Sequence, residues 1–395
     1  MKKLSNEFKF LYFSQLFANT GDILYIVGLI GYIFEHTQSA QASVYIPITI
    51  TFSLFISGWF APYVYSKWLK KDILSFCQSV KSGLMLVIFL SMITDQNSNV
   101  LYYLAALNAF LDGFTNPLKM TLIPQLERKE LISYANAQMS MMNGLVQIGS
   151  WALGGFLLML GSETIIIITV ILYLLSLLFI NQLKLIQDVR DTSQLSVSHS
   201  FKEMLRTNLT LAESHFLTIH TLFESIGHSV WIAAILLVYV SERLDASDKW
   251  FGIINATFFI GVLLGGIILA RKNNQLMNHA YLYIIFIPLA LSVINVSFGY
   301  TQVILFALLL SLIFGILDEI RSTLLHTKIQ LSLDDEKLTA LYTLNGMIHS
   351  FCFSVSSFIS AAVADHFSVT IAFYWAAIAY VGCFIISMKY RKLFN

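Results

Sequence analysis

The chain has 395 residues, of which 57% are hydrophobic and 12% charged. Soluble proteins carry about twice that charged fraction, and the core of one soluble protein could not bury so much apolar surface. In a bilayer, apolar side chains can instead remain exposed to the lipid. The composition therefore excludes a soluble enzyme, a secreted scaffold and a nucleic-acid binder, and it predicts that the chain's surroundings are lipid. The net charge of +1 offers no block of like charge to bind a charged polymer.

Apolar segments of membrane-spanning length recur along the chain. A bilayer core about 30 Å thick needs about 20 apolar residues per helix. We therefore predict an all-α membrane protein with twelve transmembrane helices in two pseudo-symmetric six-helix bundles. The expected spans are 8–36, 42–66, 73–93, 98–125, 133–160, 163–183, 212–240, 249–270, 280–299, 301–327, 337–363 and 368–388.

The positions of the cations predict the orientation of these helices. Lys and Arg accumulate in cytoplasmic loops, and here nearly all loop cations fall on alternate loops, with Arg243 and Lys249 as the exceptions. We therefore expect a multi-pass protein of the cell membrane with both termini in the cytoplasm. The polar N-terminus lacks a small-residue cleavage pattern, which favours a retained first helix over a signal peptide.

A polar stretch near the middle of the chain divides it into two halves. It contains a Ser-rich run, Ser193 to Ser200, and ends in a short amphipathic segment, Phe201 to Leu205. We expect an N-terminal six-helix bundle at 1–183, a cytoplasmic linker at 184–211 and a C-terminal six-helix bundle at 212–395.

The two halves are related by sequence. A shift of 206 residues superimposes Leu111 and Asp112 on Leu317 and Asp318, and the same shift aligns the first helix of each half: Phe10, Leu11, Leu16, Phe17 and Gly21 with Phe216, Leu217, Leu222, Phe223 and Gly227. Repeated halves of this kind are typical of secondary transporters, in which the substrate site lies between the halves at the middle of the membrane.

Several short motifs resemble one branch of a known family. They are Leu11 to Asp22, Tyr32 to Ala40, Asn116-Pro117, Leu122 to Gln125, Ala135-Asn136 and Gly154-Gly155. Together they resemble the macrolide-efflux and enterobactin-exporter branch of the major facilitator superfamily. The resemblance implies the two-bundle fold and proton-coupled export of a small organic solute. One departure concerns the loop after the second helix, where Ser66 takes the position of the family's Asp, although Lys67, Lys70 and Lys71 keep its positive charge.

The first helix carries a polar stripe. Gln15, Asn19 and Asp22 lie four and three residues apart, hence on one face. At about 1.5 Å per residue, Asp22 lies about 21 Å into the helix, near the middle of the membrane. An ionisable group at that depth is a candidate functional residue, so we predict that the Asp22 carboxylate binds protons and that Gln15 and Asn19 contact the substrate. The alternative is an Asp that only bonds a neighbouring helix.

The seventh segment carries a second stripe, His220, Glu224 and His228, spaced by four residues. The three side chains could bind a metal, but one straight helix rarely supplies three ligands, and we predict no metal or other cofactor. Glu224 and His228 are instead expected to bind protons and His220 to contact substrate. The repeat places His228 opposite Asp22, which predicts a proton-responsive pair.

The fourth and tenth segments carry the remaining candidates for substrate binding: Asp112, Asn116 and Lys119, then Asp318, Glu319 and Arg321. Opposite charges one turn apart can also neutralise each other within a helix. Either role is open at this stage. Lys81 of the third segment is expected to extend its ammonium group to the inner interface.

The sequence lacks the phosphate-binding loop of ATPases and the commonest hydrolase and redox motifs. We therefore expect a transporter without ATP, not an enzyme, whose partners are protons, a small-molecule substrate and the bilayer, and which acts as a monomer. Two substrate classes remain open. We prefer a siderophore-like or other anionic metabolite, because cations within the membrane are costly and a drug pump has less need of them; the alternative is a drug or macrolide. A membrane-embedded enzyme acting on a lipid is the alternative of another class.

Overall fold

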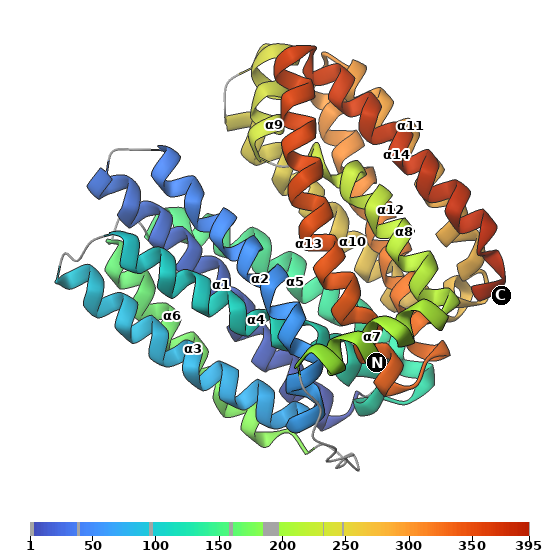
Figure 1. Ribbon diagram of the computed structural model, residues 1–395. Helices are drawn as coiled ribbons and strands as arrows, with labels where there is room; N and C mark the ends of the chain where they lie inside the picture. The colour runs from blue at the N-terminus through green and yellow to red at the C-terminus, as the bar shows by residue number, and fades with distance from the viewer. Residues whose placement is uncertain are drawn as a thin grey trace. The chain divides into compact units, whose positions relative to one another are not determined.

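The computed structural model describes residues 4–37, 40–94, 98–157, 161–184, 197–231, 233–246 and 249–394. Helices fill nearly all of these ranges, which contain no strand (Figure 1), and the prediction of an all-α protein is confirmed. The helices are α1 (Asn6–Thr37), α2 (Ala40–Lys67), α3 (Lys70–Ile93), α4 (Ser98–Leu126), α5 (Lys129–Leu157), α6 (Ser162–Gln182), α7 (Val197–Thr210), α8 (Ala212–Ser229), α9 (Ala233–Val238), η2 (Tyr239–Arg243), α10 (Lys249–Asn278), α11 (Ala280–Tyr300), α12 (Ile304–Ser332), α13 (Asp335–His366), α14 (Val369–Lys389) and η3 (Arg391–Leu393).

Each expected span is mainly helical over its described residues, and most boundaries agree within a few residues. The seventh span differs, because it divides into α8, α9 and the π-helix η2. At the end of α8, the Ser229 hydroxyl donates to the carbonyl of Ile226 and contacts the Ser360 hydroxyl at 2.6 Å. The helix α8 ends at Ser229, one residue beyond His228.

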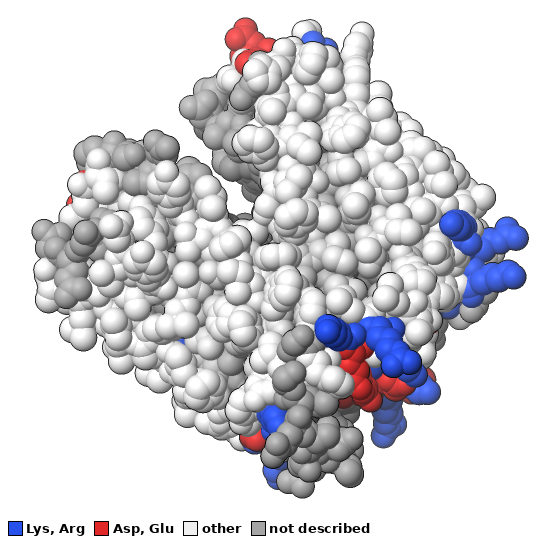
Figure 2. Space-filling view, in the orientation of Figure 1, with Lys and Arg blue, Asp and Glu red and all other residues white. Residues whose placement is uncertain are grey.

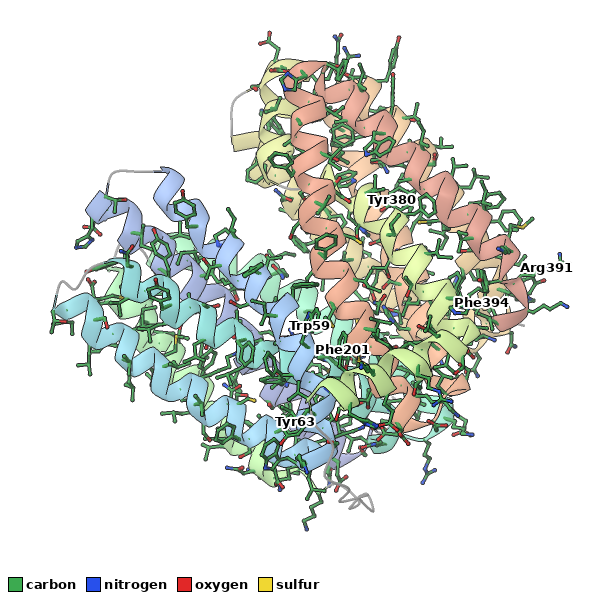
Figure 3. The ribbon with its side chains drawn as sticks, viewed as in Figure 1. Trp59, Tyr63, Phe201, Tyr380, Arg391 and Phe394 are labelled. Carbon is green, nitrogen blue, oxygen red and sulfur yellow. The ribbon has the colours of Figure 1, made fainter. Side chains whose placement is uncertain are left out.

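The linker helix α7 is longer than the amphipathic segment expected at Phe201 to Leu205. Phe201 stacks on Trp59 of α2, with ring centroids 4.8 Å apart and planes within 3° (Figure 3). The preceding part of the linker, including the first half of the Ser-rich run, lies outside the described residues.

Eight helices within the described ranges are long and apolar enough to cross a membrane. Figure 2 shows broad faces without charged side chains along the helices, while Lys, Arg, Asp and Glu gather at the helix ends. This distribution is the one expected of helices whose middles contact hydrocarbon, and it indicates a multi-pass membrane protein.

The chain forms two compact units. Unit 1 comprises residues 1–131, 145–207 and 339–347, and unit 2 comprises residues 132–144, 208–338 and 348–395. In unit 1, α6 packs on α1 and α3, and α4 packs on α2 and α3. The corresponding pairs in unit 2 are α14 with α8 and α11, and α12 with α10 and α11.

The sequence repeat is visible in the packing of glycine against tyrosine. A Cβ on Gly21 would lie 2.7 Å from the Tyr173 ring, and a Cβ on Gly227 would lie 2.6 Å from the Tyr380 ring. Only a residue without a side chain admits the ring so closely. The two pairs are displaced by 206 and 207 residues, so the same helix contact is built twice.

A second repeated contact joins tyrosine to backbone. The Tyr32 hydroxyl donates to the Met92 carbonyl at 3.1 Å, and the Tyr239 hydroxyl donates to the Phe298 carbonyl at 2.8 Å. Each bond ties the first span of a half to the third. The repeat therefore extends from sequence to particular packing contacts.

Candidate functional site

Unit 1 holds a buried ion-pair network centred on Lys81. The Lys81 ammonium, on α3, donates to Asp22 of α1 at 2.7 Å and to Asp112 of α4 at 2.6 Å. Lys81 is only 1% exposed. The prediction that its side chain extends to the interface was wrong, because two carboxylates on neighbouring helices neutralise the ammonium group where it lies.

Tyr173 of α6 completes this network. Its hydroxyl donates to Asp22 at 2.5 Å, and its ring lies 4.7 Å from the Lys81 ammonium. Asp22 therefore accepts from two donors on two other helices. The sequence contained one signal for Tyr173, since Tyr380 follows it at nearly the repeat distance, but the pairing of Lys81 with Asp22 required the packing of α1 against α3 and α4.

The other candidates of unit 1 lie around this network. Gln15 is buried and Asn19 half-buried on α1, two turns and one turn before Asp22. Asn116 is exposed on α4, and its side-chain oxygen accepts from the half-buried Lys119 ammonium at 3.1 Å. Lys119 thus has an amide partner, whereas Lys81 has two carboxylates.

Unit 2 holds a second network centred on Arg321 of α12, which is also 1% exposed. Its guanidinium donates to Asp318 at 2.7 Å, one turn earlier on the same helix, and to Glu224 of α8. Neutralisation within a helix, one of the two roles open for Arg321, is what the geometry shows. The planar, multiply donating guanidinium suits a site with two carboxylates on different helices.

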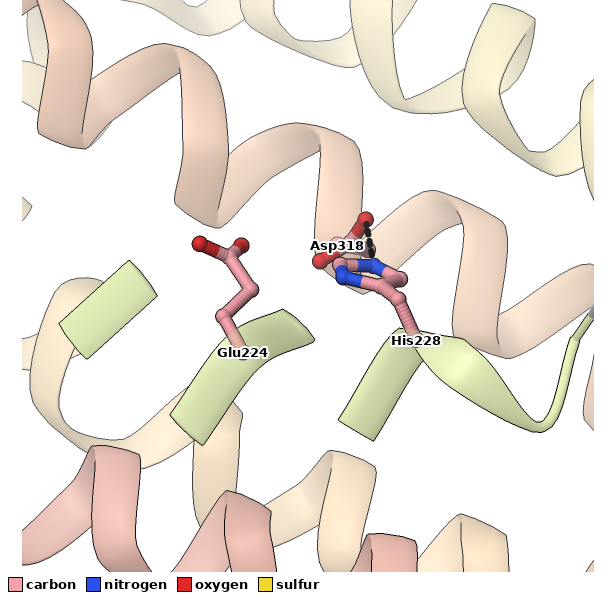
Figure 4. A group of neighbouring side chains, drawn as sticks. All are labelled: Glu224, His228 and Asp318. Carbon is pink, nitrogen blue, oxygen red and sulfur yellow. Dashed lines mark hydrogen bonds and ion pairs between the residues drawn. The ribbon is translucent and has the colours of Figure 1, made fainter. Parts of the chain in front are cut away.

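Two histidines of α8 extend the Arg321 network. His228 Nε2 lies 3.1 Å from Asp318 Oδ2, and His220 lies 3.4 Å from both Arg321 Nη1 and Glu224 Oε2. Figure 4 shows Glu224 and His228 extending from α8 toward Asp318 of α12. The stripe of histidine and glutamate predicted on this helix therefore faces a single partner helix.

Ligand atoms of Glu224, His228 and Asp318 all come within 4.8 Å of one another, which is close enough for a shared metal ion. However, both carboxylates already bind the Arg321 guanidinium. Because that group supplies the positive charge the carboxylates need, we interpret the cluster as an ion-pair network.

Glu319 takes no part in the Arg321 network, although it follows Asp318 directly. Its carboxylate accepts from Thr323 at 2.6 Å, and its stem packs against Gly265 of α10. Consecutive residues of a helix face directions about 100° apart, so α12 presents Asp318 to α8 and Glu319 to α10.

The two networks differ in charge. In unit 1, Lys81 bonds Asp22 and Asp112, and the nearby Lys119 adds a second positive charge that acts on both carboxylates through space without bonding them. In unit 2, Arg321 is the one cation that pairs with Glu224 and Asp318 among the described residues. Neutral histidines leave the unit 2 network with one excess negative charge, and protonation of His228 removes it. Unit 2 can therefore change its charge by binding one proton at an imidazole, the side chain whose unperturbed pKa lies closest to neutral pH.

The model of the Major Facilitator Superfamily matches residues 11–356 of the chain. The chain belongs to this superfamily. It is therefore a transporter and not an enzyme, as the sequence predicted; the macrolide-efflux and enterobactin-exporter branch stays a prediction.

Curated relatives support this assignment. The chain is 24% identical over 384 residues to YfmI, an uncharacterized MFS-type transporter of Bacillus subtilis (strain 168), covering 95% of this chain and 94% of that protein. It is also 24% identical over 286 residues to the uncharacterized MFS-type transporter YjbB of the same organism, covering 72% and 70%.

Solved transporters share the fold. A bacterial homologue of the iron transporter ferroportin, in an outward-facing state, superimposes with a TM-score of 0.82 at 12% identity, over 98% of this chain and all of that one. The human organic anion transporter MFSD10 gives 0.81 at 12% identity, over 96% and 98%. The E. coli fucose:proton symporter FucP gives 0.76 at 13% identity, over 97% and 98%. Such different substrates on one fold mean that the substrate must be argued from the site.

Proposed function

We propose that this protein is a proton-coupled exporter of small organic cations. It works by alternating access of two six-helix bundles, 1–183 and 212–395, with both termini in the cytoplasm. The observation that carries the proposal is the pairing of each buried cation, Lys81 and Arg321, with two carboxylates.

The substrate charge follows from that pairing. The expectation of an anionic metabolite depended on buried cations that were free to bind it. Lys81 and Arg321 are each occupied by two carboxylates, and moving either to a substrate would leave buried carboxylates unpaired, at a cost of several kcal/mol. The excess negative charge of unit 2 instead attracts a positive charge, which is either a proton or a cationic solute.

Competition between these two positive charges supplies the coupling. A proton bound in the Arg321 network removes the charge that attracts a cationic solute, and a bound solute favours loss of the proton. Such mutual exclusion is reciprocal by linkage. An inward proton gradient then drives the solute outward.

An anionic substrate is the second candidate, and Lys119 is the observation that favours it. Its ammonium group has an amide oxygen as partner and is half-buried beside the Lys81 network. A carboxylate-bearing solute could bind there without breaking an existing ion pair.

Inside-out proteoliposomes with an imposed pH gradient separate the two candidates. We expect uptake of ethidium, an organic cation, to depend on the gradient and to be accompanied by proton efflux. Carboxyfluorescein serves as the anionic probe in the same vesicles. Gradient-driven uptake of carboxyfluorescein without ethidium uptake would overturn the cationic assignment, and uptake of either dye without proton movement would overturn the coupling.

Lys119→Gln sharpens this experiment. The variant should leave ethidium uptake intact, because Lys119 holds neither carboxylate of the Lys81 network directly. Loss of carboxyfluorescein uptake in the same variant would instead support the anionic candidate.

A further inference from the structure

A polar seam lies between α5 and α12 in unit 2. On α12, Glu319, Thr323, Thr327 and Gln330 follow one another at spacings of four, four and three residues, which places them on one face. All four are buried. On α5, Asn136 and Ser140 occupy one face four residues apart. We call these six residues the α5–α12 seam.

Hydrogen bonds run along the seam. The Asn136 amide donates to Thr327 Oγ1 at 2.9 Å and to Gln330 Oε1 at 2.6 Å. The Thr323 hydroxyl donates to Glu319 Oε1 at 2.6 Å, and Ser140 also hydrogen-bonds to Glu319. Two helices that belong to different parts of the sequence are thus joined by uncharged donors and acceptors, with one carboxyl group among them.

Glu319 is enclosed by helix backbone as well as by side chains. A Cβ on Gly265 of α10 would lie 2.9 Å from the Glu319 Cβ, so α10 closes over the glutamate stem. Beside it, Gly266 of α10 receives the side chain of Met141 from α5. Glu319 is therefore buried where α5, α10 and α12 meet.

Among the described residues of these three helices, no Lys or Arg side chain contacts the Glu319 carboxyl group. α10 presents Gly265 to it, and α5 presents Ser140. The charged neighbour on α12 is Asp318, which would repel an ionised Glu319 and is itself bonded to Arg321 and His228. Neutral Glu319 fits this environment, whereas an ionised carboxylate without a cation costs several kcal/mol in such surroundings.

We propose that Glu319 is a second proton-binding residue of the transport cycle, which keeps the α5–α12 seam closed while protonated and opens it when ionised. On opening, water enters, takes the proton from the carboxyl group and solvates the carboxylate. Proton release at Glu319 is thereby tied to separation of α5 residues 132–144 from α12. This inference rests on the proposed function for its place in the cycle, but not for its test.

Cysteine accessibility tests the proposal without any substrate. Ser133 is buried on α5, one turn before Asn136, and Ser133→Cys changes only one atom. The rate of N-ethylmaleimide labelling is measured in the full-length protein between pH 5.5 and 8.5, with the labelling of the native cysteines in the parent subtracted. The same rate is measured in the Glu319→Gln background, because Gln keeps the shape and hydrogen bonds of the protonated acid but cannot ionise.

The ratio of the two rates at each pH cancels the ionisation of the thiol itself. We expect a ratio near one at pH 5.5 that rises about tenfold or more by pH 8.5, because an unpaired buried charge shifts the closed state by at least that factor. A ratio that does not change with pH would overturn the proposal.

Two further variants identify the titrating group. Thr323→Val removes a donor to the Glu319 carboxylate, so the seam should open at a higher pH than in the parent. If Glu319→Gln cannot be purified, this shift in pH is the measurement that tests the proposal. Loss of the rise in Asp318→Asn would assign the titration to Asp318 and contradict the proposal. If the labelling ratio rises with pH but the protein transports no organic cation, only the proposed function is overturned. If the protein transports the cation but the labelling ratio stays constant, only the proposed role of Glu319 is overturned.

Discussion

The two charge networks take their carboxylates from equivalent helices of the repeat but take the cation from different ones. In unit 1 the cation comes from α3, and Asp22 and Asp112 come from the first and fourth helices; in unit 2 it comes from α12 itself, beside Asp318. Tyr173 donates to the unit 1 network, whereas two histidines contact the unit 2 network. Unit 1 therefore has a phenol as its neutral donor, whereas unit 2 has two imidazoles, the side chain whose unperturbed pKa lies closest to neutral pH.

A similar difference separates two other equivalent positions. Gly113 of α4 and Glu319 of α12 are related by the shift of 206 residues, and each faces the second span of its own half, at Ser57 and Gly265 respectively. The packing is kept while the carboxyl group occurs in unit 2 alone. The repeat thus preserves contacts between helices and leaves the ionisable groups to diverge, which places the proposed proton chemistry mainly in unit 2.

Removing either central cation has the largest expected effect. Lys81→Met and Arg321→Met each leave two buried carboxylates without a cation, and we expect a loss of about 3–5 kcal/mol in the free energy of unfolding. Unfolding in detergent measures it. Adding Asp112→Asn to Lys81→Met should recover part of the loss, and no recovery would contradict the ion-pair interpretation.

The paired tyrosines give the sharpest comparison. Tyr173→Phe removes a donor to the Asp22 carboxylate and should cost about 1.5–3 kcal/mol. Tyr380→Phe should cost far less, because the buried Tyr380 hydroxyl has no hydrogen-bond partner among the described residues. The same unfolding assay compares them, and equal losses would mean that the Asp22 contact contributes nothing.

Titration of the unit 2 network is tested by His228→Gln. The variant keeps a side-chain amide beside Asp318 but cannot bind a proton. We expect the ratio of ethidium transport rates at pH 6 and pH 8 to change by about tenfold relative to the parent, equivalent to about 1.4 kcal/mol. Asp22→Asn should change this ratio less, and an unchanged ratio in both variants would remove the predicted pair from the coupling mechanism.

The smallest effect concerns a helix cap outside the membrane. Asp334 caps α13 by accepting from the Lys337 ammonium at 2.7 Å and from the Lys337 backbone N–H at 3.0 Å, and these bonds lower the pKa of Asp334. The stabilisation is present above the unfolded pKa of about 4 and is lost as the pH falls through the lower folded pKa.

Asp334→Ala should therefore destabilise the protein by about 1 kcal/mol at pH 7 and by less at pH 3. Asp334→Asn, which keeps a capping oxygen, is the matched control and should retain most of the stability. Equal losses in the two variants would assign the effect to the ion pair with Lys337.

The sequence predicted the twelve spans well because each depends on a local run of apolar residues. It also indicated candidate site residues that the structure brings together in the two networks, because ionisable groups within apolar segments are conspicuous in a sequence. These residues are Asp22, Asp112, Glu224, His228, Asp318 and Arg321. It placed Lys81 wrongly and could not separate Glu319 from Asp318, because both assignments depend on which neighbouring helix each side chain meets. The break after His228 was also missed, because the apolar run that predicted the seventh span continues across it.

Proton release on substrate binding tests the central claim most directly. Ethidium is added to the purified protein in weakly buffered detergent solution near pH 6, and a pH-indicator dye follows the solution. The account predicts that protons appear in the solution as the cation binds, and that Glu224→Gln, which removes one carboxylate of the Arg321 network, weakens both signals. Binding of ethidium with no proton released would contradict competition between proton and solute for that network.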